Sequence, residues 1–383
     1  MYNILTLNKI SKYGLNQLDS AKYACSDDCA APDAIMVRSA KMHEFAFDAK
    51  TVAVARAGAG VNNIPVDACA KAGIAVFNTP GANANAVKEL VLCAMLMASR
   101  KVADSIDWCK TLSGKGDEVS ALVEKGKSAF AGPEILGKTL GVVGLGAIGA
   151  LVANSAKALG MNIVGYDPFL SVKAALALDP AVKVVSDLDE LFAVSDYITL
   201  HVPLNDATRD TVSADSLAKM KDGVRILNFA RGELVNEAAI IDALGTGKAA
   251  AYVTDFPTDK QITTPGVTAI PHLGASTPES EDNCAVMAAN ELVDYLEKGV
   301  ITNSVNLPNI ALPASFKTRV CLIYNAGEGM ADKITAAFDG CGVTSLVSGE
   351  KKGIGYTAVD VESAPDSAKL EAIDGVIRVR VLG

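Results

Sequence analysis

The stretch from Leu140 to Gly149, LGVVGLGAIG, decides how this chain folds. Four apolar residues ending at Val143 can form a buried strand, and they lead straight into the spacing Gly-x-Gly-x-x-Gly that starts at Gly144. An Ala-rich segment with helical character follows. A strand, a glycine turn and a helix in this order are typical of a dinucleotide site, because the free N–H groups at the start of the helix attract a diphosphate. The alternative is a glycine turn with a purely structural role.

Each glycine has its own task in the dinucleotide interpretation. Gly144 permits the tight turn, Gly146 lets the backbone approach the diphosphate, and Gly149 allows the helix to pack closely on the strand. A second apolar strand, 162–166, ends in Asp167. An acidic side chain there can accept hydrogen bonds from both ribose hydroxyls and repels a 2′-phosphate, so the sequence predicts NAD rather than NADP.

Length and composition limit the possible classes of protein. The 383 residues exceed what one core supports, so two or three domains are predicted. Half of the residues are hydrophobic but 5% are aromatic, which predicts cores of Ala, Val, Leu and Ile. The formal net charge of −9 argues against nucleic acid or an anionic membrane as a partner. An anionic substrate would therefore need a local basic pocket.

Several features predict a soluble, cytoplasmic protein. The N-terminal MYNILTLNKI lacks the basic segment and long apolar core of a signal peptide. Eight cysteines without metal-ligand spacing are interpreted as reduced thiols, and no metal is predicted. The uncharged segment 139–156 is long enough to suggest a membrane span, but its glycines favour the strand, turn and helix.

Residues 1–96 alternate short apolar runs of strand length with helical or loop segments. Polar residues follow two of these runs, as Arg38-Ser39 and as the segment RAGAGVNN that starts at Arg56. Because ligands bind at the carboxyl ends of parallel strands, both arginines are candidates for holding a carboxylate or phosphate, with a solvated surface charge as the alternative. The predicted strands are 4–7, 34–37, 52–56 and 74–77.

The same alternation continues from 140 to 275 and predicts a doubly wound parallel sheet with a site along one edge. A helix over 84–100 is expected to cross between domains, and 101–138 is expected to be a linker with one short helix. Trp108 in that linker is expected to be a packing residue. The further strands are 162–166, 182–185, 197–200, 225–228 and 269–270.

We therefore predict an α/β chain with two doubly wound, Rossmann-like domains and a small C-terminal ferredoxin-like domain. A discontinuous substrate-binding domain is expected to comprise 1–96 and 279–312, and a dinucleotide-binding domain 97–278. The tail, 317–383, has the predicted order strand, helix, strand, strand, helix, strand, which is typical of the ferredoxin-like fold.

A nicotinamide site that reduces a keto group needs a proton donor, and histidine suits this role because it titrates near neutrality. The chain has three histidines. His43 lies in a polar stretch and is expected at the surface, while His201 ends a strand and is expected to line the cofactor cleft. His272 follows the last strand of the dinucleotide domain and is the predicted proton donor.

Five segments resemble the D-isomer-specific 2-hydroxyacid dehydrogenases, and with the tail they span essentially the whole chain. Several such motifs in the right order are specific, whereas any one of them would not be. The tail resembles an ACT domain, which favours the branch of the family that acts on a phosphorylated acid. The segments are RAGAGVNNI at 56–64, NTPG at 78–81, GLGAIG at 144–149, NFARGELV at 228–235 and PHLGAST at 271–277.

The resemblance implies roles for the catalytic residues. Arg231 would bind the substrate carboxylate and polarise the keto oxygen, and His272 would be the acid–base residue. The family's carboxylate partner usually follows the pattern Asp-Val-Phe-x-x-Glu, but this chain has the shorter Asp-Phe-Pro-Thr-Asp from Asp255 to Asp259. Asp259 is the expected counterpart, with Asp255 as the alternative. Either carboxylate would favour the protonated imidazole.

The resemblance also implies contacts with NAD and with a small phosphorylated hydroxy acid, which two arginines would suit in an acidic protein. Cofactor contacts are implied for Thr79, Gly144, Gly146, Ala147, Ile148, Gly149, Asp167, Val202, Pro203, Ala230, Arg231, Asp255, His272, Gly274 and Ala275. Substrate contacts are implied for Arg38, Ser39, Arg56, Ala59, Gly60, Arg231 and His272.

The ACT-like tail is expected either to bind serine for feedback or to serve as an oligomer interface in a homodimer or homotetramer. Its first loop, 324–330, lacks the histidine and the Pro-Gly pair usual in serine-binding relatives, which favours assembly. Two other functions remain open: another D-2-hydroxyacid dehydrogenase of the glycerate or glyoxylate type, and a non-catalytic sensor of NAD(H). The set Arg231, Asp259 and His272 weighs against the sensor.

Overall fold

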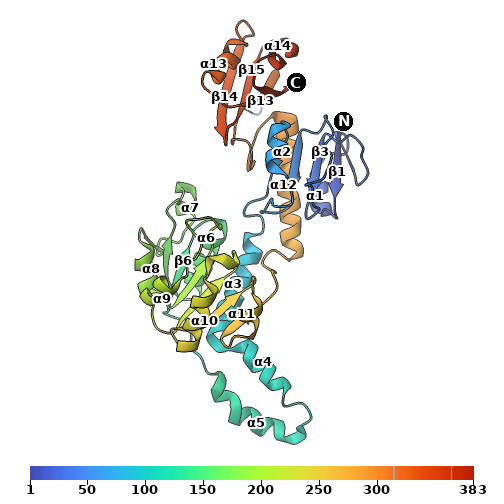
Figure 1. Ribbon diagram of the computed structural model, residues 1–383. Coiled ribbons are helices and arrows are strands. Elements are labelled where there is room, and N and C mark those ends of the chain that lie inside the picture. The colour runs from blue at the N-terminus through green and yellow to red at the C-terminus, as the bar shows by residue number, and fades with distance from the viewer. Residues whose placement is uncertain (314, 364) are drawn as a thin grey trace. The chain divides into compact units, whose positions relative to one another are not determined.

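The computed structural model describes residues 1–313, 315–363 and 365–383 (Figure 1). Its contacts divide the chain into two units, Met1–Asn83 with Pro278–Gly383, and Ala84–Thr277. The sequence placed this first boundary at 96, inside helix α3 (Ala84–Arg100). The whole of α3 falls in the second unit because its apolar face, including Val91 and Met95, shares a core with that unit's sheet.

The first unit contains a five-stranded parallel sheet in the order β2-β1-β3-β4-β5, and helix α12 (Pro278–Lys298) packs on it. Ala285, Ala288 and Leu292 of α12 share a core with the sheet. β2 was not predicted, because Tyr23 alone of its four residues is buried and an edge strand lacks a continuous apolar run. The strands are β1 (Tyr2–Leu7), β2 (Tyr23–Ser26), β3 (Ala34–Val37), β4 (Ala53–Arg56) and β5 (Ala75–Phe77), and the short helices are α1 (Lys12–Leu15) and α2 (Val66–Lys71).

The second unit is built on a seven-stranded parallel sheet in the order β12-β11-β10-β9-β6-β7-β8, which confirms a doubly wound fold. Its central strand β6 (Thr139–Val143) lies between β7 (Asn162–Tyr166) and β9 (Tyr197–Leu200). The chain order reverses at this point, so a ligand crevice is expected beyond the carboxyl end of β6. The other strands are β8 (Lys183–Val185), β10 (Val224–Asn228), β11 (Ala249–Thr254) and β12 (Val267–Ala269).

The segment 101–138 corrects the prediction of a linker with one short helix. It forms two α-helices, α4 (Val102–Lys110) and α5 (Val119–Gly126), which project from the sheet of their unit (Figure 1). Trp108 packs on Phe130 with 5.2 Å between the ring centroids. The remaining helices of the unit are α6 (Ala147–Ala158), α7 (Val172–Leu176), α8 (Leu188–Val194), α9 (Ala214–Lys219), α10 (Glu237–Thr246) and α11 (Asp259–Thr263).

The tail confirms the ferredoxin-like prediction. Its antiparallel sheet has the order β14-β15-β13-β16, and two helices cross between the strands. Cys321, Ile323 and Tyr356 on this sheet share a core with Tyr295 and Leu296 of α12. The tail therefore continues the core of the first unit. Its elements are β13 (Thr318–Asn325), α13 (Met330–Ala336), β14 (Val343–Lys351), β15 (Ile354–Val361), α14 (Ser367–Glu371) and β16 (Val376–Leu382).

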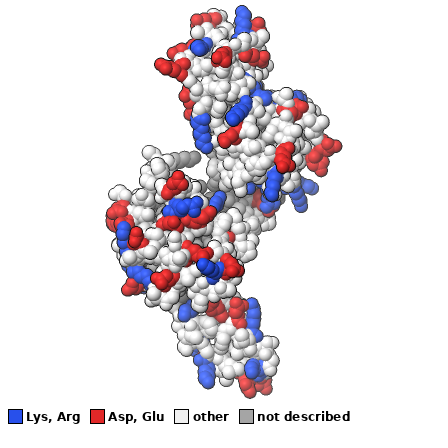
Figure 2. Space-filling view, viewed as in Figure 1, with Lys and Arg blue, Asp and Glu red and all other residues white. Residues whose placement is uncertain are grey.

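The surface carries both signs of charge, and acidic and basic side chains are interspersed on the face drawn in Figure 2. Among the described residues, no helix is both long and apolar enough to cross a membrane.

Candidate functional site

The glycine turn after β6 has the geometry that its sequence predicts. Gly144 has a φ of +92°, and a Cβ on it would lie 2.5 Å from the carbonyl oxygen of His201. A Cβ on Gly149 would lie 1.8 Å from the carbonyl oxygen of Gly144, so the helix approaches the turn closely. A Cβ on Gly146, in contrast, would meet no described atom within 4 Å. The backbone at Gly146 is therefore open to a ligand.

Helix α6 begins at this open position, with Gly146 as its N-cap. Since no side chain in the described part of the chain caps it, the N–H groups of its first turn, including those of Ala147 and Ile148, are available to an anion. Asp167 lies beside the turn, where its Oδ2 accepts a hydrogen bond from the Leu145 N–H at 2.9 Å. Its Oδ1 accepts from the Phe169 N–H at 2.9 Å. Each oxygen keeps a lone pair for a ribose hydroxyl, so these residues fit NAD.

Arg231 lies on the loop after β10, and a buried asparagine holds this loop. The Asn228 side chain donates from Nδ2 to the Arg231 carbonyl oxygen at 2.8 Å and accepts from the Ala230 N–H at 3.2 Å. The exposed guanidinium of Arg231 lies 5.7 Å from the centroid of the Phe256 ring. Asn228 was not among the predicted site residues, although a polar residue that ends a buried strand is a usable signal.

Phe256 connects the arginine to the predicted acid–base residue. Its ring centroid lies 4.4 Å from that of His272, on the loop after β12. The preceding residue, Asp255, is 2% exposed, and a Cβ on Gly274 would lie 3.7 Å from its Oδ2. Burial raises the pKa of Asp255, while the nearby charges of His272 and Arg231 act in the opposite direction. Neither carboxylate oxygen has a hydrogen-bond partner of good geometry in the described residues.

Asp259, the expected partner of the histidine, lies four residues after Asp255 at the start of a helix. It is the first residue of α11 and is exposed. Within the described ranges, no hydrogen bond or ion pair joins its carboxylate to His272. Of the two candidate carboxyl groups, that of Asp255 is the one buried near the charge of His272.

His201 follows β9 and is unsuited to donate a proton near neutral pH. Its Nε2 lies 2.9 Å from the Thr199 hydroxyl, and its buried Nδ1 has no partner among the residues described. Burial lowers the pKa of His201 to about 4, so its imidazole is neutral at pH 7. The next residue, Val202, closes on the glycine turn, because its Cγ1 would lie 2.9 Å from a Cβ on Gly144. Pro203 follows it on the same loop.

The two predicted anion-binding arginines of the first unit have partners within the protein. Arg56 donates from Nε to the Arg38 carbonyl oxygen at 3.0 Å and from Nη1 to the Gly60 carbonyl oxygen. Burial lowers the pKa of Arg56, and the nearby charge of Arg38 adds to this. Arg38 in turn pairs with Glu281 at 2.5 Å. The Arg56 side chain thus shapes its own loop, and an anion would have to compete with Glu281 for Arg38.

The other predicted residues of this unit lie on loops of the same sheet edge. Thr79 is fully buried and donates its N–H to the Gly58 carbonyl oxygen at 3.2 Å. The carbonyl oxygen of Ala59 accepts from Asn78, and the Ser39 N–H donates to Asn8 at 2.9 Å.

Comparisons with known proteins give a consistent result. The protein-family model described as "D-isomer specific 2-hydroxyacid dehydrogenase, NAD binding domain" matches residues 92–274 of this chain. A hydroxypyruvate reductase of Thermotoga maritima is 42% identical over 64% of this chain and 76% of its own. A D-3-phosphoglycerate dehydrogenase of Methanocaldococcus jannaschii is 39% identical over 68% of this chain and 48% of its own. The chain spans about half of the length of the curated D-3-phosphoglycerate dehydrogenases that it matches, between 48% and 59%.

Solved structures agree with this result. A glyoxylate reductase from Paecilomyes thermophila has a TM-score of 0.62 and 28% identity, covering 79% of this chain and 98% of the other. The NAD+-bound 3-phosphoglycerate dehydrogenase of Entamoeba histolytica has a TM-score of 0.59 and 26% identity, and the match covers 80% of this chain and 98% of the other.

Proposed function

Because the chain belongs to the D-isomer specific 2-hydroxyacid dehydrogenases, we propose that it oxidises 3-phospho-D-glycerate to 3-phosphohydroxypyruvate with NAD, the first step of the phosphorylated route to L-serine. The observation that carries the proposal is the grouping of Arg231, Asp255 and His272 on neighbouring strand-end loops of the sheet that holds the open glycine turn. D-3-phosphoglycerate dehydrogenases at 33% to 39% identity support the choice of substrate.

The proposed mechanism divides the work among three side chains. Bound NAD supplies the acceptor for the hydride from C2 of the substrate. Arg231 binds the substrate carboxylate and polarises the reacting oxygen, while His272 takes the hydroxyl proton during oxidation and returns it during reduction. Asp255 stabilises the imidazolium that forms. Asn228 is a positioning residue, because its amide holds the backbone of Ala230 and Arg231.

We infer that Asp255, rather than the sequence-favoured Asp259, is the partner of His272. We expect Asp255→Asn to lower kcat by about 100-fold, since the imidazolium loses its stabilising charge. Asp259→Asn, on the exposed start of α11, should stay within about threefold of the parent protein, and stopped-flow NADH oxidation measures both. A large loss in Asp259→Asn with a mild one in Asp255→Asn would return the role to Asp259.

A panel of keto acids tests the substrate. We expect NADH oxidation to be faster with 3-phosphohydroxypyruvate than with hydroxypyruvate, glyoxylate or 2-oxoglutarate, because a phosphate can compete with Glu281 for Arg38 on the proposed substrate loops. Preference for an unphosphorylated acid would favour a glycerate or glyoxylate enzyme, a reading that the hydroxypyruvate reductase of Thermotoga maritima supports. Tight NADH binding without turnover of any of them would favour a sensor.

The remaining proposals concern domains, assembly and location. We propose that the first unit binds the substrate, that the second binds NAD, and that 317–383 is an ACT-like domain with a role in assembly or serine control.

We also propose that the protein is a cytoplasmic homodimer or homotetramer. Exposed apolar side chains on α4, among them Ile106 at 51% exposure, support self-association. Sedimentation of Ile106→Lys beside the parent protein tests this, with a smaller assembly expected for the variant.

A further inference from the structure

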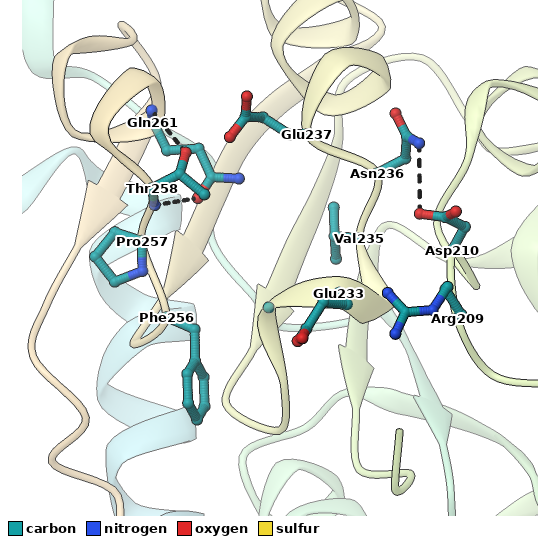
Figure 3. Close-up of a pocket in the computed structure, with 11 residues that line it drawn as sticks. Arg209, Asp210, Glu233, Val235, Asn236, Glu237, Phe256, Pro257, Thr258 and Gln261 are labelled. Carbon is teal, nitrogen blue, oxygen red and sulfur yellow. Dashed lines mark hydrogen bonds between the residues drawn. The ribbon is translucent and has the colours of Figure 1, made fainter. Parts of the chain in front are cut away.

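A cavity lies beside the loop that carries Arg231. Its volume is about 470 Å³, and all of its walls belong to the second unit. Figure 3 shows it between the start of α10, the Phe256–Gln261 segment and the loop that carries Arg209. Phe256 and Pro257, together with Val235, form an apolar part of the lining. The cavity is large enough for a small metabolite.

The polar part of the lining has an uneven balance of charge. The carboxylates of Asp210, Glu233 and Glu237 line the cavity with one guanidinium, that of Arg209. Lys260 approaches Glu237 at 3.6 Å but is 76% exposed, so its pairing is weak. Excess carboxylate favours a ligand with a positive group and disfavours a simple anion such as a phosphorylated acid. The cavity is therefore not a second place for the proposed substrate.

A buried amide supplies a donor inside the same cavity. Gln261 is 3% exposed, and its Oε1 accepts a hydrogen bond from the Thr258 N–H at 3.1 Å. This contact fixes the amide plane and leaves Nε2 without a partner among the described residues. Figure 3 shows Nε2 pointing into the cavity on the side of Glu237. Because Nε2 opens onto the cavity, it can donate a hydrogen bond to a ligand acceptor there.

We propose that this cavity binds a small zwitterion of the α-amino acid class. The protonated amine lies against Glu233 and Glu237, and the carboxylate lies against Arg209 and the amide of Gln261. A short aliphatic side chain fits the apolar lining around Val235.

The position of the cavity gives the bound molecule access to the catalytic groups. Gly232, which follows Arg231, and Phe256 both line it. The Phe256 ring lies against His272 and beneath the Arg231 guanidinium, at 4.4 and 5.7 Å. An occupant therefore contacts residues that support both the arginine and the histidine.

Titration calorimetry of the full chain with three matched probes tests the proposal. L-alanine carries both charged groups, ethylamine lacks the carboxylate, and propionate lacks the amine. We expect saturable binding of L-alanine at millimolar concentration, and binding about tenfold or more weaker for each of the other two, since each loses a charge-assisted contact. Ethylamine or propionate binding as tightly as L-alanine, or no binding of L-alanine, would overturn the proposal.

Variants locate the binding. We expect Glu237→Gln and Arg209→Gln each to weaken L-alanine binding by about tenfold. The matched control is Glu190→Gln, which also changes a first-turn glutamate paired with a lysine, on α8 and away from the cavity, and should bind L-alanine like the parent. NADH binding by each variant verifies folding. Unchanged L-alanine binding in both cavity variants would exclude this cavity, whatever the keto-acid panel shows.

Discussion

At the residue scale, we expect alanine substitutions at Gly146 and Gly149 to have different effects, although both glycines belong to one turn. We expect Gly149→Ala to disrupt folding, because its Cβ would lie 1.8 Å from a backbone oxygen that cannot move aside. Gly146→Ala should unfold like the parent protein but bind NADH about tenfold more weakly, since its Cβ enters the open space of the diphosphate. Thermal unfolding and NADH fluorescence titration measure the two effects. Parent-like NADH binding in Gly146→Ala would show that the diphosphate does not bind at this turn.

The same residues show what the sequence could and could not predict about the site. The glycine spacing and Asp167 depend on local chain geometry, so the turn was predictable from its own residues. The burial of Asp255 near His272 was not predictable in this way, because it depends on where the buried strand β11 ends. That strand was missed, since its sequence AAAYVT starts with helix-favouring alanines. Asp255 follows it directly and is therefore buried beside the imidazole.

At the scale of the element, α12 carries a carboxyl group that should make the first unit sensitive to pH. Glu291 is 6% exposed and accepts a hydrogen bond from Asn303 at 2.8 Å. Burial raises the pKa of Glu291 to about 8, so the folded state holds a proton that the unfolded state has lost above pH 4.5. The free energy of unfolding should therefore fall as pH rises from about 4.5 to 8 and level off above that.

We expect Glu291→Gln to remove this dependence and to raise the free energy of unfolding at pH 9 by an amount of the order of 3 kcal/mol. The amide keeps the oxygen that Asn303 contacts and carries no charge to bury. Urea unfolding at pH 5, 7 and 9 gives the comparison, and Glu279→Gln, exposed on the same helix, is the control. Equal pH slopes for Glu291→Gln and the parent would show that Glu291 ionises freely.

At the scale of the whole molecule, the order of the strands and helices was more useful for predicting the fold than their exact boundaries. The ferredoxin-like tail followed from its element order alone, because few ways of pairing four strands with two crossing helices are available. The pair α4 and α5 did not follow: both helices are amphipathic, but no described residue of either is buried. The polar residues and glycines of 101–138 favoured a linker over a pair of helices.

A buried ion pair lies within the tail, its arginine also contacts the end of α12, and this pair tests whether the two units unfold independently. Arg319 donates to both oxygens of Asp360, at 2.6 and 2.8 Å, and to the carbonyl oxygens of Lys298 and Pro313. We expect Arg319→Met to destabilise the first unit by about 3–5 kcal/mol, because Asp360 is left buried without its partner. The double variant with Asp360→Leu should recover much of the loss, since no lone charge remains.

The second unit has its own cores and should therefore unfold independently of Arg319→Met. We expect the urea midpoint followed by NADH fluorescence to stay at the parent value, while the midpoint followed by the tyrosine signal of the first unit moves to lower urea. A common shift of both signals would mean that the chain unfolds as one cooperative body.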